Sequence, residues 1–222
     1  MDLQLAGRRA VITGASRGIG LAIERGLALE GAVVSICARD PGGLADAVDR
    51  LGREGLTAHP YVVDVTDTAQ LEATVVQAAS EQGGLDLVVA NAGGSRGGGL
   101  QTSTAEDWKY TLDVNVVHAA TAIRAAVPWL SASGQGAALM IGSISGWKPR
   151  ASSSYAVAKA AEIHLAAALA VELARERIRV NTLSPGSVMF PGGRWARTHA
   201  AGFHESAPDP PCNTSSLGSA NF

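Results

Sequence analysis

The sequence predicts one α/β domain built on a doubly wound parallel sheet of the Rossmann type. Short runs rich in β-branched residues alternate with longer alanine-rich stretches of helical period, which is the pattern of βαβ units. Nearly all the short runs are continuously apolar, as expected of strands that helices cover on both faces. The 222 residues contain no repeat with a period of tens of residues, so a single core is expected.

Six strands are expected because six runs of four to six residues are mostly apolar. They lie at Ala10–Thr13, Ala32–Cys37, Ala58–Val63, Leu85–Ala90, Ala137–Ile141 and Arg179–Leu183. Each run is followed by turn residues or by a helical stretch, which predicts parallel strands joined by right-handed crossovers.

Five helices are expected between these strands, and Ser, Thr or Asp residues open several of them as caps. They lie near Gly18–Glu30, Gly42–Glu54, Thr68–Gln82, Thr104–Leu130 and Ser152–Arg175. Pro128 stands near the end of the fourth helix and is expected to close or kink it. The segment Gly93–Gly99 has five glycines among seven residues and predicts a loop.

Composition and charge exclude several function classes. Eighteen basic and twenty acidic residues give a net charge of −2 without a run of like charge, so neither nucleic acid nor an anionic membrane is an expected partner. Cys37 and Cys212 lie in unlike contexts, which suggests neither a disulfide nor a metal site. The segment Met1–Leu5 lacks the features of a signal peptide, and no apolar stretch is expected to reach the length of a membrane span. A cytoplasmic protein is therefore expected.

Three glycines lie where the first strand meets the first helix. Gly14, Gly18 and Gly20 would let the backbone approach a pyrophosphate at a helix N-terminus, whose free N–H groups and dipole favour an anion. Their spacing, Gly-x-x-x-Gly-x-Gly, differs from the general Gly-x-Gly-x-x-Gly fingerprint. An alternative interpretation is that they serve only tight packing.

Tyr155 and Lys159 are four residues apart and share one face of a predicted helix. A lysine ammonium near a tyrosine favours the phenolate and makes the tyrosine a better acid. Ser143, twelve residues upstream of Tyr155, directly follows a strand and lies where α/β folds place their sites. Taken alone, the pair would be interpreted as a surface tyrosine and a solvated lysine.

Together these motifs resemble those of the classical short-chain dehydrogenase/reductase (SDR) family. The resemblance runs from the N-terminus to about Arg197 and rests on the following segments: Thr13–Gly20, Asp64, Asn91-Ala92-Gly93-Gly94, Asn115, Ser143, Tyr155-x-x-x-Lys159 and Pro185-Gly186. It implies an oxidoreductase that moves hydride between nicotinamide and a carbonyl or alcohol.

The resemblance assigns four catalytic residues. Tyr155 would be the general acid or base, and Ser143 would hold the substrate oxygen. Lys159 would tune Tyr155 and bind the nicotinamide ribose. Asn115 would shape a helix bend and hold a water of a proton relay, although it could instead be a buried polar residue satisfied by backbone.

The resemblance also implies a nicotinamide-cofactor site. Its residues would be Gly14, Ser16, Arg17, Gly18, Ile19, Gly20, Arg39, Asp64, Val65, Asn91, Ala92, Gly93, Tyr155, Lys159, Pro185, Gly186 and Val188. Among them, Asp64 would bind the adenine amino group, and Asn91 is interpreted as a structural tie between strands rather than a catalytic group.

The segment after the second strand favours NADP(H). Ala38 stands where NAD-specific folds carry an acidic residue, and Arg39 with Arg17 could bind a 2′-phosphate. NAD(H) stays open, because a strand ending later would make Asp40 the ribose ligand.

The substrate is less well defined. The segment Ser187–Trp195, with Trp147 as a further candidate wall, could line an apolar pocket, so small apolar or aromatic ketones are expected.

The relatives that the resemblance suggests are dimers or tetramers built on two long helices, which here would be Thr104–Leu130 and Ser152–Arg175. A homodimer is therefore expected.

The C-terminal residues do not fit the fold. In Ala201–Phe222, twelve of twenty-two residues are Gly, Pro, Ser, Thr or Asn, so no core strand is expected and the final helix and strand of the family are missing. A catalytic domain is assigned to residues 1–197 and an irregular tail to residues 198–222, as if the chain were truncated or frame-shifted after Arg197.

A nucleotide-binding module with impaired catalysis is therefore the alternative function. An extended-family epimerase or dehydratase is disfavoured.

Overall fold

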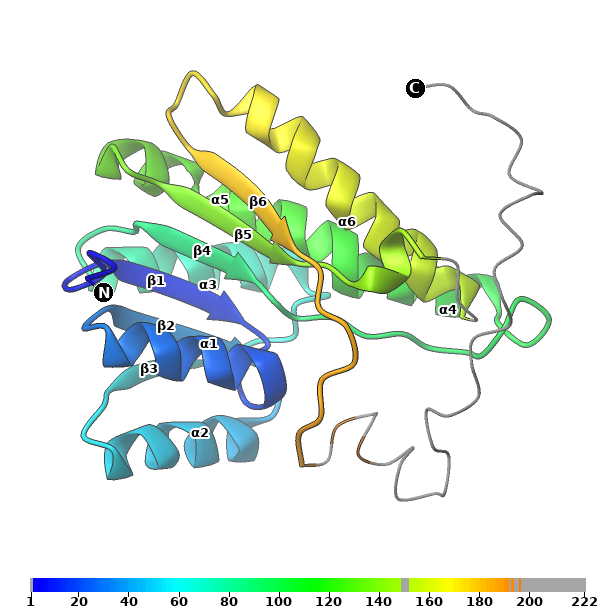
Figure 1. Cartoon of the computed structure of the whole chain (residues 1–222), viewed down its shortest axis with the longest axis horizontal. Coiled ribbons are helices and arrows are strands. Elements are labelled where there is room, and N and C mark those ends of the chain that lie inside the picture. The colour runs from blue at the N-terminus through cyan, green and yellow to red at the C-terminus, as the bar shows by residue number, and fades with distance from the viewer. Residues whose placement is uncertain (1, 149–151, 192, 194–195, 197–222) are drawn as a thin grey trace. The chain divides into compact units, whose positions relative to one another are not determined.

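A computed structural model describes residues 2–148, 152–191, 193 and 196 of the chain. Six parallel strands form one sheet in the order β3-β2-β1-β4-β5-β6 (Figure 1). The strands are β1 (Arg9–Thr13), β2 (Val33–Ala38), β3 (Ala58–Val62), β4 (Leu87–Ala90), β5 (Ala137–Ile141) and β6 (Arg179–Leu183). Each lies within two residues of its expected bounds, so the Rossmann-type prediction is confirmed.

The helices fill the crossovers between the strands. They are α1 (Gly18–Leu29), α2 (Pro41–Arg53), α3 (Thr68–Glu81), α4 (Ala105–Leu112), η1 (Asp113–Val117), α5 (His118–Ser133), η2 (Ile144–Gly146) and α6 (Ser153–Glu172). Two of the starts follow directly from capping residues. Asp67 accepts a hydrogen bond from the Gln70 N–H at the start of α3, and Thr104 and Asp107 form a reciprocal capping box at the start of α4.

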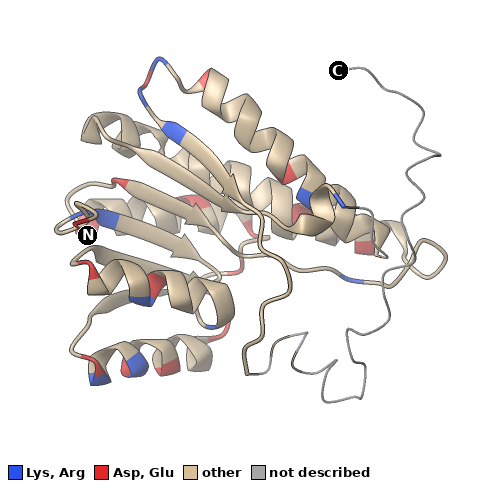
Figure 2. Ribbon diagram, viewed as in Figure 1, with Lys and Arg blue, Asp and Glu red and all other residues tan. Residues whose placement is uncertain are grey.

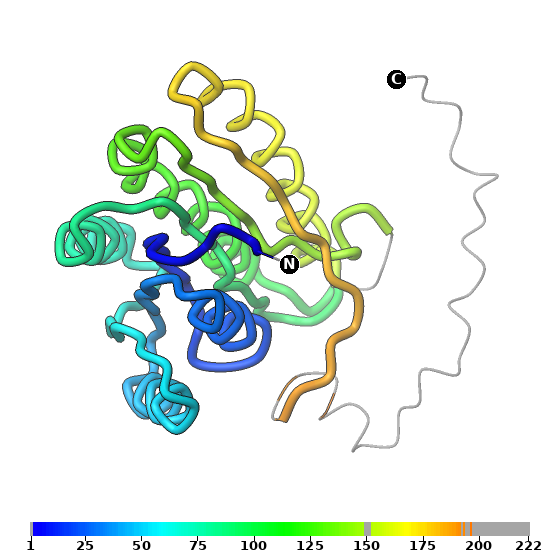
Figure 3. The backbone as a smooth tube through the Cα atoms, turned by 60° about the vertical axis from the view of Figure 1, so that its left-hand side comes forward, coloured from blue at the N-terminus to red at the C-terminus, as the bar shows by residue number. Residues whose placement is uncertain are grey.

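Two hydrophobic cores lie on opposite faces of the sheet. Alternate strand residues such as Val11 and Met140 pack with α3, α5 and α6, whereas Ile12 and Ile36 pack with α1 and α2. In Figure 3 the cyan, green and yellow helices of the first group form one row. The period of two along each strand therefore distributes the apolar side chains between both helix layers.

The expected fourth helix is interrupted, which corrects the sequence prediction. A π-helical turn, η1, separates α4 from α5, and α5 continues through Pro128 to Ser133. Pro128 therefore does not close the helix. Because Leu130 beyond it is fully buried, packing outweighs the one hydrogen bond that a proline removes, and Gly134 ends the helix with φ of 68°.

Helix α6 also corrects an expectation. It has 20 residues, and an 18-residue window of it has a mean hydropathy of 1.2, so it is long and apolar enough to cross a membrane by length and composition alone. The prediction that no stretch reaches this length is therefore wrong. Length and composition are weak evidence, since a core helix can pass the same test, and α6 packs beside β5 and β6. Along α2, Asp46 and Asp49 precede Arg50 and Arg53, and Figure 2 shows acidic and basic residues together on this helix.

Contacts divide the chain into two units, Met1–Gly186 and Ser187–Phe222, and every named helix and strand belongs to the first. The assigned boundary at residue 197 stays a prediction. The predicted irregular tail, residues 198–222, lies outside the described residues.

Candidate cofactor and active site

The glycines between β1 and α1 stand where side chains do not fit. Gly14 has φ of 66°, and a Cβ there would lie 2.7 Å from the Ala92 Cα. Gly18 has φ of 61°, which favours glycine. Arg17, the residue before α1, makes no side-chain cap hydrogen bond. The first N–H groups of α1 therefore have no capping side chain, and the loop can bring a bound anion close to them.

Asn91 fastens this loop to the end of β4. Its Nδ2 donates to the carbonyl oxygens of Thr13 and Gly14, both at 2.9 Å. The Thr13 Oγ1 accepts from the N–H groups of Asn91 and Ala92 at 3.0 and 3.1 Å. Asn91 and Thr13 thus tie the carboxyl ends of two neighbouring strands together, which is the structural role predicted for Asn91.

His118 extends this buried polar group, although the sequence analysis did not single it out. Its Nε2 lies 3.2 Å from the Thr13 Oγ1, and its side chain is fully buried. Burial, with repulsion from the Lys159 charge, lowers the His118 pKa to about 3. The imidazole is therefore neutral, and its Nε2 can accept the Thr13 hydroxyl proton.

Asn115 lies fully buried within the π-helical turn η1. Its Nδ2 donates to the carbonyl oxygens of Thr111 and Gly94 at 2.6 and 2.7 Å, and its Oδ1 accepts from the Gly94 N–H at 3.3 Å. Backbone groups therefore satisfy Asn115, as the alternative interpretation anticipated. The same contacts hold the glycine-rich loop after β4 against the helix bend.

Lys159 is buried, with a side chain 4% exposed. Its Nζ donates to the Ile141 carbonyl oxygen at 2.8 Å and lies 2.7 Å from the Glu162 Oε2. A Cβ on Gly93 would stand 3.1 Å from this Nζ and 2.8 Å from the Asn115 Oδ1. Burial lowers the Lys159 pKa, and the Glu162 carboxylate opposes that effect. Glycine at position 93 therefore leaves room beside both predicted catalytic groups.

Tyr155 stands one helical turn before Lys159 on α6. Its side chain is half-buried, and its ring centroid lies 5.7 Å from the Lys159 Nζ. This distance allows the ammonium to act electrostatically on the phenol. The alternative of a solvated lysine does not fit, because the ammonium lies inside the protein.

Ser143 lies two residues after the end of β5 and is half-buried. Its Oγ accepts from the Ser145 N–H at 3.1 Å, which leaves the hydroxyl proton available to another acceptor. A Cβ on Gly146 would lie 2.7 Å from the Lys159 carbonyl oxygen, so the Ser143 segment packs directly on α6. The Pro185 carbonyl oxygen accepts from the Ile144 N–H at 3.1 Å and joins the turn after β6 to this segment.

The end of β2 brings together the residues expected around the adenosine. Strand β2 ends at Ala38, and the Arg39 Nη1 lies 3.9 Å from the Asp64 Oδ2. Asp40 caps α2, because its carboxylate accepts from the N–H groups of Gly42 and Gly43, both at 3.2 Å. Hydrogen bonds from Thr66, chiefly its N–H, lower the Asp64 pKa, with Arg39 adding to the effect.

Further predicted residues complete this end of the site. A Cβ on Gly43 would lie 3.3 Å from the Ser16 Cβ, so the glycine loop approaches the start of α2. Arg17 is exposed, Ile19 is partly buried in α1, and Val65 is buried after β3. These positions agree with a nucleotide lying across the carboxyl ends of β1, β2 and β4.

The structure does not bring every predicted residue to the site. Val188 belongs to the second unit, whose placement relative to the first is not defined. Trp147 is 61% exposed, with the Lys148 Nζ 4.9 Å from its ring centroid. Trp195, a member of the expected substrate loop, lies outside the described residues.

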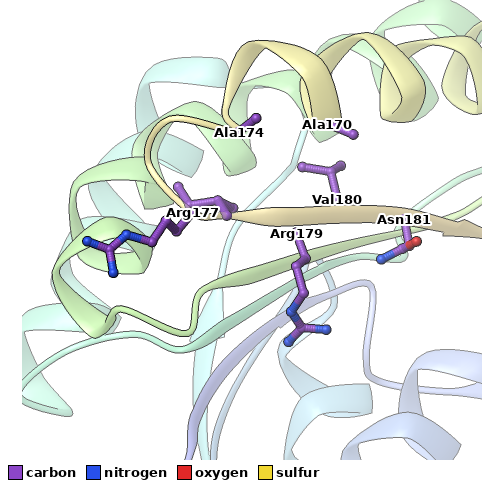
Figure 4. A pocket seen from close by; sticks show the side chains of 7 residues that line it. Ala170, Ala174, Arg177, Arg179, Val180 and Asn181 are labelled. Carbon is purple, nitrogen blue, oxygen red and sulfur yellow. The ribbon is translucent and has the colours of Figure 1, made fainter.

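A cavity of about 610 Å³ lies elsewhere, where the end of α6 meets the edge strand β6 (Figure 4). It is lined by Ala170, Ala174, Arg177, Ile178, Arg179, Val180 and Asn181. This is the opposite end of α6 from Tyr155. The cavity therefore takes no part in the site built around Lys159.

Known proteins are similar to this chain in sequence and in fold. A family profile described as short chain dehydrogenase matches residues 8–197. Dehydrogenase/reductase SDR family member 4 of Pongo abelii is 38% identical over 186 residues, covering 83% of this chain and 67% of that protein. L-sorbose reductase of Gluconobacter frateurii, solved with NADPH and L-sorbose, matches with a TM-score of 0.84 at 35% identity, over 89% of this chain and 75% of the other.

NAD⁺-bound xylitol dehydrogenase matches with a TM-score of 0.82 at 30% identity, over 88% of this chain and 75% of the other. The family profile spans the strands, the glycine loop and the helix of Tyr155 and Lys159, and members of this family are oxidoreductases that use NAD(P). The chain therefore belongs to the short-chain dehydrogenase/reductase family.

Proposed function

We propose that the chain is an NADP(H)-preferring reductase or dehydrogenase that interconverts a carbonyl and an alcohol. The observation that carries this proposal is the geometry of α6, where a buried Lys159 ammonium lies 5.7 Å from the Tyr155 ring centroid and beside Gly93. A charged, desolvated lysine next to a tyrosine is the arrangement that general acid–base chemistry by a phenol requires.

Tyr155 donates its proton to the carbonyl oxygen during reduction and takes it back during oxidation. The Ser143 hydroxyl, whose lone pair already accepts from the Ser145 N–H, donates to the same oxygen and orients it. Lys159 stabilises the phenolate that remains on Tyr155. A bound nicotinamide supplies or accepts the hydride at its C4.

The glycine loop suits a dinucleotide, because Gly14 and Gly18 leave the start of α1 open and no side chain caps it. The residues at the end of β2, where the 2′-position of the adenosine ribose would lie, favour NADP(H). Asp40 is engaged as the cap of α2, β2 ends at Ala38, and the Arg39 side chain is 66% exposed and can turn toward a phosphate. Known relatives include both NAD⁺-bound and NADPH-bound proteins.

A homodimer through the long helices is part of the proposal. Val157 and Val171 of α6 are 50% and 80% exposed, and Val117 in η1 is 40% exposed. Apolar side chains on the outer surface of these helices support a contact with a second copy. Sedimentation of the purified chain tests it, and a monomer at micromolar concentration would refute the dimer.

The activity is tested by following NADPH oxidation with small aliphatic and aromatic ketones. Tyr155→Phe should abolish turnover while NADPH binding, followed by nucleotide fluorescence, stays within about threefold of wild type. Tyr61→Phe is the matched control. Tyr61 lies in β3, the edge strand opposite β6, and its hydroxyl donates a hydrogen bond to Glu81 of α3. Turnover that survives Tyr155→Phe would refute the mechanism.

The alternative function is a nucleotide-binding module with impaired catalysis. It predicts NADPH binding by the wild-type chain without turnover of any ketone. The same assays therefore separate the two functions.

A further inference from the structure

Glu162 is a buried carboxylate beside a predicted catalytic group. It follows Lys159 by three residues and Tyr155 by seven, so all three share one face of α6. Its side chain is 0% exposed, and its Oε2 lies 2.7 Å from the Lys159 Nζ. Within the described part of the chain, neither of its carboxylate oxygens has a hydrogen-bond partner, so the ion pair with Lys159 is the contact that balances its charge. A charge buried at this depth requires a reason, because desolvation is costly.

The contacts of Lys159 show what Glu162 provides. An ammonium has three N–H donors. The Ile141 carbonyl oxygen takes one at 2.8 Å, and the Glu162 Oε2 lies in ion-pair contact at 2.7 Å. The Nζ also lies beside Gly93, because a Cβ there would stand 3.1 Å from it, and a cofactor would lie on this side. The two internal contacts therefore fix where the Nζ stands next to this space.

The other ionisable groups near Lys159 cannot balance its charge. His118 interacts with Lys159 electrostatically, but burial and the Lys159 charge lower its pKa to about 3, so it carries no charge at neutral pH. Tyr155 is neutral until it ionises. Among the described residues, Glu162 is the one carboxylate in ion-pair contact with Lys159. Burial raises its pKa to about 7, against the attraction of Lys159.

We propose that Glu162 is a positioning residue that supplies the counter-charge keeping Lys159 an ammonium and fixes where its Nζ stands. The proposal rests on the function assigned above to Tyr155 and Lys159. Without Glu162, a backbone carbonyl would be the partner left to a desolvated cation, and the amine would lose its proton. Tyr155 would then lose the charge that stabilises its phenolate.

The test is an alkaline titration of Tyr155 in the full chain, followed as tyrosinate absorbance and corrected with Tyr155→Phe. Tyr61 contributes a separate step, because burial and Glu81 raise its pKa to about 12. Glu162→Gln should raise the Tyr155 pKa by about one unit, since Lys159 stands one helical turn from Tyr155 and Glu162 stands two turns from it. Glu162→Asp keeps the charge and should return the pKa to within about 0.3 units of wild type.

The direction of the shift decides the proposal. If Lys159 remained charged without Glu162, removing the negative charge would lower the Tyr155 pKa. A lowered or unchanged value in Glu162→Gln would therefore overturn the proposal. Circular dichroism on each variant restricts the comparison to folded protein.

Two variants control for the loss of a carboxylate as such. Glu24→Gln removes a fully buried carboxylate of α1, and Glu172→Gln removes an exposed one at the end of α6. Both should leave the Tyr155 titration unchanged. A shift as large in Glu24→Gln as in Glu162→Gln would count against the specific role.

The titration needs no turnover, so it separates this inference from the proposed function. An inactive wild-type chain would refute the function and still leave the Tyr155 titration to decide the role of Glu162. In an active chain, Glu162→Gln should move the pH dependence of kcat upward by about one unit. The KM for the ketone should change less than about twofold, because Glu162 does not touch the substrate.

Discussion

Gly20 and Asn91 lie so close together that a Cβ on Gly20 would stand 2.5 Å from the Asn91 Nδ2. The same Nδ2 is held by the carbonyl oxygens of Thr13 and Gly14 and cannot move without breaking both hydrogen bonds. The end of β4 therefore sets the position of the first turn of α1. Any cofactor contact at that turn depends on this fit between two segments 71 residues apart.

Gly20→Ala should displace the Asn91 side chain and the start of α1. We expect the NADPH dissociation constant to rise at least about tenfold, measured by nucleotide fluorescence. Gly26→Ala in the same helix is the matched control, because no atom lies within 4 Å of a Cβ there. It should increase the unfolding free energy by about 0.5–1 kcal/mol and leave binding unchanged. Equal binding losses in both variants would contradict the role of the contact.

Arg39→Ala should weaken NADPH binding by about tenfold to a hundredfold, because a charge-assisted pair with phosphate is worth about 1.5–3 kcal/mol. NADH binding should change less than about threefold, since NADH lacks the 2′-phosphate. The dissociation constants of both nucleotides provide the measurement. Equal weakening of the two would refute the preference for NADP(H).

Asp40→Asn tests the competing assignment. Asparagine caps a helix about as well as aspartate, so α2 and its hydrogen bonds to Gly42 and Gly43 should persist. We expect unchanged NADH affinity and an unchanged melting temperature. A tenfold loss of NADH affinity in a stable variant would make Asp40 the ribose ligand.

Glu24 should make the fold less stable as the pH rises. It is fully buried in α1 and both its oxygens lack hydrogen-bond partners among the described residues, so burial raises its pKa from 4.5 to about 7. The unfolded carboxyl ionises first, and stability therefore falls between pH 4.5 and 7. Glu24→Met should raise the unfolding free energy about 2 kcal/mol more at pH 8 than at pH 5. Urea unfolding measures both, and equal gains would contradict the prediction.

Asp86 should contribute stability above its unfolded pKa of 3.8, and that stability should be lost on acidification. Burial favours its neutral form, but hydrogen bonds from Arg9 and Ser133 outweigh burial and lower its pKa to about 2. Asp86→Asn should lower the free energy of unfolding by about 2 kcal/mol at pH 7 and by about half of that at pH 3. The exposed Arg25–Glu54 pair is the control, and Glu54→Gln should leave the urea midpoint unchanged. A pH-independent loss in Asp86→Asn would refute the ionic origin.

The sequence was sufficient for the sheet, whereas the roles of the site residues stay predictions. Mostly apolar runs locate the six strands of the described sheet, because a buried parallel sheet leaves little freedom in composition. Gly14 and Gly18 could be recognised from their place between a strand and a helix, and their positive φ values follow from that turn. Tyr155 and Lys159 are local in sequence, so helical spacing alone puts them together.

Features that depend on tertiary packing were missed. Thr13 and His118 are 105 residues apart, and no local pattern indicates their contact. Pro128 was expected to end a helix because burial of the following turn cannot be seen in propensity. Glu162 could have been found, since an acid three residues after Lys159 shares its face, but its burial is visible only in the fold.

The π-helical turn η1 holds one residue more than an α-helix would over the same rise, since the His118 N–H bonds the carbonyl five residues back, at Asp113. Each residue of an α-helix turns by about 100°, so removing one residue here would rotate everything before the turn relative to everything after it. Asn115 and the Ala119 face of α5 could then no longer both point inward. Chain length at this turn is thus a constraint on evolution and engineering that matching side chains cannot replace.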